Sequence, residues 1–115
     1  MFKNPFFDNK GPISLKIILA ECNLIYSTKD NKIKISDVKN LDESTNVDIT
    51  FFHSIKYKNL ACKTKAKFCI TNEKLNKYLP NSCKSLIVEN VLLSLAKITK
   101  LFYPTSDSDD FDNNL

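Results

Sequence analysis

The segment DITFFHSIKY, at positions 48–57, holds residues whose types and spacing could clamp a flat, anionic ligand. Phe51 and Tyr57 carry rings that can stack on a nucleobase, and each such stack contributes roughly 1–3 kcal/mol. Lys56 can neutralise a phosphate, and Ser54 lies in the turn between the two rings. The plainer alternative is hydrophobic core, where aromatic residues at the end of a strand commonly lie. Residue types alone leave both interpretations open.

The elements around this segment show where such a ligand could bind, although aromatic residues at a strand end more often belong to the core. Residues 48–52 favour extended backbone and predict a strand. A short helix is predicted next, from residues that recur at spacings of three and four: Tyr57, Leu60, Ala61 and Thr64. Ligands of open α/β sheets collect at the carboxyl ends of strands, and the start of a helix presents free N–H groups to an anion. The predicted strand-to-helix junction is therefore a suitable place for a nucleotide.

Two further helices and three further strands are predicted. Ser14 can cap a helix whose core-facing residues are Leu15, Ile18, Leu19 and Cys22. A last helix, ending before Pro104, has one face formed by Val91, Leu95, Ile98 and Phe102. Strands are predicted around 33–35, 66–70 and 85–88. This order predicts one α/β domain over residues 1–104, with a small mixed β-sheet flanked by about three helices, and an acidic, disordered tail over 105–115.

The composition excludes several classes of function. A single glycine rules out a glycine-rich phosphate loop. All 17 basic residues are lysines, and residues 1–104 have a charge balance of +8 because four of the 13 acidic residues lie in the tail. Proteins that read nucleic-acid sequence usually rely on arginine, so no nucleic-acid partner is expected.

The cysteines and the single histidine do not predict a metal site. Cys22, Cys62, Cys69 and Cys83 form no CxxC pair, and Cys69 is expected to be a small core residue. His53 is expected to be a solvated loop residue. The sequence shows no signal peptide and no apolar run near the roughly 20 residues that span a bilayer. We therefore expect a cytoplasmic protein with reduced thiols, no membrane span and no cofactor.

Three stretches covering about residues 6–104 resemble, in order, the N-terminal domain of the UDP-3-O-acylglucosamine N-acyltransferase family of lipid A biosynthesis. They are FFDNKGPISLKIILAE, IKISDVKNLDESTNVDITFFHSIKYKNLACKTKAKFCI and LIVENVLLSLAKITKLFYP. The matching positions are Gly11, Pro12, Ser14, Leu15, Val38, Leu41, Asp48, Ile49, Thr50, Phe51, Lys56, Tyr57, Leu60, Thr64, Lys65, Ala66, Asn90, Ala96, Phe102 and Pro104.

The resemblance implies that this domain holds the uracil and ribose end of a UDP-sugar, with Phe51 and Tyr57 flanking the uracil. Lys56 matches the lysine of the family motif, and Ser54 stands where the family has an asparagine that bonds the base edge. Serine has a shorter arm, and a buried polar group left unpaired costs roughly 1–3 kcal/mol. We therefore expect the affinity for uridine to be reduced about tenfold or more.

The resemblance places the family's catalysis elsewhere, in a left-handed β-helix of hexapeptide repeats that this sequence lacks. Catalytic residues are therefore not expected here. The favoured interpretation is a truncated or split enzyme that keeps the uridine-binding lobe, with a separately encoded β-helix domain as a candidate partner. Two alternatives stay open: a non-functional remnant of that enzyme, and a basic surface that binds nucleic acid or anionic lipid.

Overall fold

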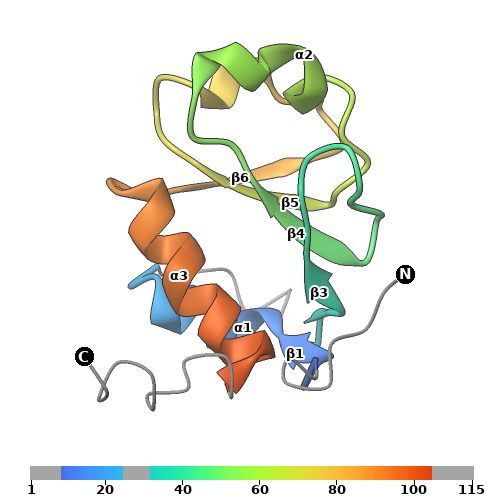
Figure 1. Ribbon diagram of the computed structural model, residues 1–115, viewed down its shortest axis with the longest axis vertical. Coiled ribbons are helices and arrows are strands. Elements are labelled where there is room, and N and C mark those ends of the chain that lie inside the picture. Colours follow the sequence, from blue (N-terminus) through green and yellow to red (C-terminus); the bar gives the residue numbers. More distant parts are fainter. Residues whose placement is uncertain (1–8, 25–31, 105–115) are drawn as a thin grey trace, which may run out of the picture.

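The computed structural model describes residues 9–24 and 32–104, in which a four-stranded parallel sheet lies between two helical layers (Figure 1). Its strands, in spatial order, are β3 (Asp37–Val38), β4 (Asp48–Phe51), β5 (Phe68–Thr71) and β6 (Lys84–Ile87). A separate antiparallel pair joins β1 (Ile13–Ser14) to β2 (Lys34–Ile35). The α/β class is confirmed. The parallel and antiparallel pairings lie in two sheets rather than in one mixed sheet.

One face of the parallel sheet is covered by α1 (Leu15–Glu21) and α3 (Val91–Phe102), at the bottom of Figure 1. Both helices begin at a capping side chain, as the sequence predicts for the first. The Ser14 hydroxyl accepts from the Lys16 N–H at 3.2 Å, and the Asn90 side chain accepts from the Leu93 N–H at 3.0 Å. The buried cluster on this face consists of Leu15, Ile18, Leu19, Ile35, Ile49, Phe68, Ile70, Leu86, Val91, Ile98 and Phe102.

The other face is covered by shorter helical turns: η2 (Ile55–Tyr57), α2 (Lys58–Ala61) and η3 (Asn76–Tyr78). A second buried cluster lies beneath them, made of Leu41, Phe52, Ala61, Ala66, Cys69, Leu75 and Cys83. The helix predicted over residues 56–64 is thus shorter than expected. Within this helix Leu60 is 40% exposed, whereas Ala61 is fully buried.

Strand β5 explains why the core divides in two. All four of its residues are buried, and they alternate between the faces. Phe68 and Ile70 join the cluster under α1 and α3, whereas Cys69 joins the cluster under α2. Burial on both faces is typical of parallel strands. Cys69 is a core residue, as predicted, and a hydrogen bond with Cys83 together with burial holds the pKa of its thiol above the usual range.

The single glycine lies where the chain must approach its neighbours closely. A Cβ atom added at Gly11 would lie 2.8 Å from the Ser36 carbonyl oxygen and 3.0 Å from the Phe102 ring. The preceding residue, Lys10, donates its N–H to the Phe102 carbonyl at 2.7 Å. Gly11 therefore lets the segment before β1 pack tightly against the end of α3.

The acidic tail predicted over 105–115 lies outside the described residues. Among the residues that are described, none belongs to a helix with the length and apolar character needed to cross a bilayer.

Candidate functional site

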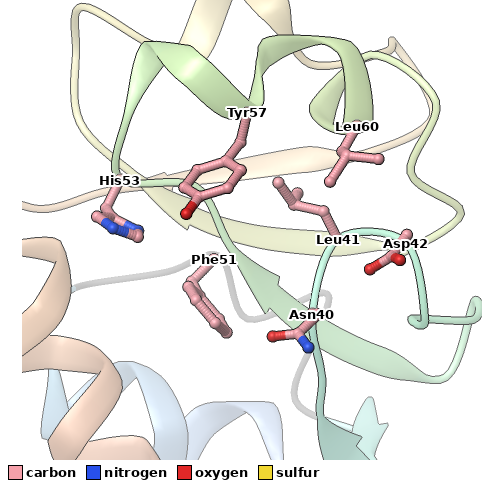
Figure 2. Close-up of a pocket in the computed structure, with 7 residues that line it drawn as sticks. All are labelled: Asn40, Leu41, Asp42, Phe51, His53, Tyr57 and Leu60. Carbon is pink, nitrogen blue, oxygen red and sulfur yellow. The ribbon is translucent and has the colours of Figure 1, made fainter.

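A hollow of about 280 Å³ opens at the carboxyl end of β4 (Figure 2). Its lining combines aromatic, aliphatic and polar side chains from three segments of the chain. These residues are Asn40, Leu41, Asp42, Phe51, His53, Tyr57 and Leu60. The hollow thus occupies the edge of the parallel sheet where ligands of open α/β folds usually bind.

Phe51 and Tyr57 reach this hollow from different layers of the fold. Phe51 is the last residue of β4 and packs against the cluster under α1 and α3, whereas Tyr57 ends η2 and packs against the cluster under α2. Both side chains are half-buried. Figure 2 shows Tyr57 reaching down from above and Phe51 lying below, with open space between them. The two residues predicted from the sequence therefore border one space, rather than packing back to back in the interior.

His53 supplies a third ring to the same hollow. Its ring centroid lies 6.3 Å from that of Phe51, in a stacked arrangement, and 5.7 Å from that of Tyr57. His53 is exposed, as predicted for a loop residue, but its place in the lining was not predicted. The period of two in extended backbone was the available signal, because it puts His53 on the same side as Phe51.

Ser54 and Lys56 occupy supporting positions. The Ser54 hydroxyl accepts a hydrogen bond of 3.4 Å from the Lys56 N–H and so caps η2. Neither residue lines the hollow. The Lys56 ammonium lies 5.2 Å from the centroid of the Tyr57 ring, within the range of a cation–π interaction. Ser54 and Lys56 therefore lie beside Tyr57, and their contact with a ligand stays a prediction.

The opposite wall comes from the connection between β3 and β4. Asp48 is buried and holds this connection, because its Oδ2 accepts from the Thr45 N–H at 2.8 Å and from the Thr45 hydroxyl at 2.9 Å. The same oxygen lies 3.8 Å from the Lys39 ammonium. From the far side, the Thr64 hydroxyl donates to the Leu41 carbonyl at 2.9 Å. These contacts fix Asn40, Leu41 and Asp42 against the hollow.

A second hollow, of about 570 Å³, adjoins the first. Asn40 and Phe51 line both, so the two share a boundary. The second is more polar and includes Asp37 and Tyr103, whose hydroxyl donates to Asp37 Oδ1 at 2.8 Å. Burial, with a contribution from this hydrogen bond, raises the pKa of Tyr103 to about 12. The paired hollows can accept a ligand that is flat at one end and polar at the other.

The family model described as UDP-3-O-(3-hydroxymyristoyl) glucosamine N-acyltransferase, LpxD, matches residues 32–101. This match covers well over half of the chain and includes every residue that lines the first hollow. The chain belongs to the LpxD family.

Curated relatives carry the name UDP-3-O-acylglucosamine N-acyltransferase. One from Rickettsia typhi (strain ATCC VR-144 / Wilmington) is 30% identical over 105 residues, which is 90% of this chain and 30% of the relative. Another, from Rickettsia bellii (strain RML369-C), is 30% identical over 105 residues, or 90% of this chain and 31% of the relative. The chain therefore spans somewhat less than a third of these LpxD-family proteins.

Proposed function

We propose that this LpxD-family domain, residues 1–104, binds the uridine end of a UDP-sugar, with the uracil in the hollow between Phe51 and Tyr57. The observation that carries this proposal is the convergence of these two rings, from separate layers, on one open space. The names of the curated relatives support the choice of ligand, because they specify a UDP-linked acylglucosamine.

The size and lining of the hollow fit one end of such a ligand. Drug-sized ligands occupy pockets of about 300–1,000 Å³, so a hollow of about 280 Å³ suits a small ring rather than a whole nucleotide sugar. Its neighbour of about 570 Å³ offers room for the rest. Stacking on aromatic side chains contributes roughly 1–3 kcal/mol per base, which predicts weak but measurable binding of uridine alone.

The proposal assigns the domain a binding role and leaves acyl transfer out of it. Among the described residues, no group of His, Cys, Asp and Glu side chains is suitable for a metal ion. Within this proposal Phe51 and Tyr57 contact the base, while Ser54 and Lys56 act through Tyr57. A cytoplasmic location is part of the proposal, and the free thiols of Cys22, Cys62, Cys69 and Cys83 fit a reducing compartment.

Titration of isotope-labelled protein tests the proposal. Uridine and UDP-N-acetylglucosamine, raised to millimolar concentration, should shift the NMR signals of Phe51, His53 and Tyr57, and adenosine should shift them less. Tyr57→Phe keeps the ring and should retain binding, whereas Tyr57→Ala should weaken it about 5- to 100-fold. Leu92→Ala serves as a control, because this exposed side chain lines neither hollow.

The same titration decides between the proposal and its alternative. Absence of uridine-dependent shifts at these three residues, in folded protein, would reject nucleotide binding and leave a remnant without this function.

A further inference from the structure

Asn40 lies beside Phe51 in the fold, although nothing in the sequence around Asn40 predicts this. Strands β3 and β4 are parallel, with Val38 opposite Ile49. The ladder continues one step further, because the Lys39 N–H donates to the Ile49 carbonyl at 3.0 Å. Asn40 is therefore aligned with Phe51 just beyond the paired residues. It is the polar side chain nearest in register to the ring that forms one wall of the proposed uracil site.

The amide of Asn40 has its nitrogen toward Glu43, and both side chains are exposed. Its Nδ2 donates to Glu43 Oε1 at 3.2 Å. An ionised carboxylate accepts hydrogen bonds but cannot donate them, so the group facing Glu43 must be the NH₂. The carbonyl oxygen of the amide consequently points away from Glu43. Figure 2 shows this oxygen on the side of Phe51 and the nitrogen on the opposite side.

The backbone carbonyl of Asn40 accepts more hydrogen bonds than its side chain makes. Its carbonyl accepts from the Glu43 N–H at 3.1 Å, from the Ser44 N–H at 3.0 Å and from the Ser44 hydroxyl at 2.8 Å. Ser44 is itself buried. A turn fixed at this many points presents the Asn40 oxygen to the hollow as a preorganised acceptor.

From this geometry we infer that Asn40 selects the pyrimidine, its Oδ1 accepting a hydrogen bond from the N3–H group of uracil. The inference rests on the proposed function and adds the basis of its specificity. Uracil carries a hydrogen on N3, whereas cytosine presents a lone pair there, which an acceptor oxygen repels. Glu43 is a positioning residue, because it sets which end of the amide faces the base. Ser54 stands at the position of the family's asparagine and does not line the hollow. In this proposal Asn40 supplies the amide instead.

Binding of three nucleosides tests this role. Wild-type protein should bind uridine about 2- to 10-fold more tightly than cytidine or 3-methyluridine, which lacks the N3–H donor. In Asn40→Ala this preference should disappear, while stacking retains part of the affinity. In Glu43→Gln the preference should shrink. A glutamine can donate to Asn40 as well as accept from it, so the Asn40 amide can flip and exchange the positions of its oxygen and nitrogen.

Leu92→Ala provides the control, since this exposed side chain lines neither hollow. Leu92→Ala should leave the preference for uridine unchanged. Loss of the preference in Leu92→Ala, or its persistence in both Asn40→Ala and Glu43→Gln, would overturn the assignment to Asn40 while uridine binding itself stood. Failure of wild-type protein to bind uridine would instead overturn the proposed function. Circular dichroism of each variant separates lost binding from lost folding.

Discussion

Phe51 and Phe52 are adjacent in the chain but belong to opposite sides of the parallel sheet. Phe51 borders both hollows and is half-buried, whereas Phe52 is fully buried in the cluster under α2 and meets the edge of the Tyr78 ring at a centroid distance of 6.4 Å. The pleat of the strand separates them. Two identical side chains therefore have different roles, one at the site and one in the core.

This separation predicts opposite results for two alanine variants. Phe51→Ala should weaken uridine binding about 5- to 100-fold and, because the half-buried ring only borders the cluster under α1 and α3, should cost less stability than Phe52→Ala. Phe52→Ala should lower the free energy of unfolding by about 3–5 kcal/mol, the cost of a large cavity in a core. Urea unfolding and NMR titration measure the two effects. Similar losses of stability in both variants would contradict the assignment of Phe51 to the site.

Two buried threonines make a second matched pair. Thr50 and Thr71 are both fully buried, but the Thr71 hydroxyl donates to the Phe52 carbonyl at 2.8 Å, whereas the Thr50 hydroxyl has no partner among the described residues. Thr50→Val should therefore raise the free energy of unfolding by about 1 kcal/mol, and Thr71→Val should lower it by a similar amount. Urea unfolding checks the signs. Destabilisation by Thr50→Val would show that its hydroxyl does have a partner in solution.

The wall formed by residues 40–42 should depend on Asp48 more than on the ion pair that Asp48 makes. Asp48→Ala removes two hydrogen bonds to Thr45 and should cost about 2–3 kcal/mol of stability. Lys39→Ala removes only a partly exposed partner at 3.8 Å and should cost less than about 1 kcal/mol. Thermal unfolding of both variants tests this order. A larger loss in Lys39→Ala would mean that the charge pair, rather than the turn, holds the wall.

The hydrogen bond between Tyr103 and Asp37 predicts a dependence on alkaline pH. Because the folded protein holds the pKa of Tyr103 at about 12, above the ordinary value of about 10, the fold favours the neutral phenol. This contribution to stability is complete below pH 10 and is lost as the pH rises from about 10 to 12. NMR titration of labelled tyrosine should find that the Tyr103 ring titrates near pH 12, and Asp37→Asn should lower its pKa. A Tyr103 pKa unaffected by Asp37→Asn would contradict the contribution of that carboxylate.

Much of this fold can be predicted from the sequence because helix caps and helix ends are set by neighbouring residues. The helix α1 follows its cap at Ser14, and α3 begins after Asn90 and ends before Pro104. Phe51 and Tyr57 attract notice because they lie six residues apart across one strand end, and the family resemblance is what makes them candidates for a uracil site. The parallel arrangement of the strands, and hence which loops meet at one edge, depends on contacts between distant segments.

The parts of the site that pattern does not predict come from those contacts. Asn40 reaches the hollow through the pairing of β3 with β4, and nothing near it in the sequence indicates a ligand. Ser54 stands at the motif position of the family's asparagine and was expected to reach the base edge less well, and its hydroxyl accepts from the Lys56 N–H. A serine just before a helical turn satisfies a free backbone N–H, and that local demand decides its orientation here.

Leu41 belongs both to the buried cluster under α2 and to the wall of the hollow. The same side chain therefore contributes both to the stability of the fold and to the proposed binding. Substitutions in the buried cluster beneath α2 that displace Leu41 would weaken binding even if Phe51 and Tyr57 were unchanged. A bound base, in turn, would stabilise the contact between the helical layer of α2 and the sheet.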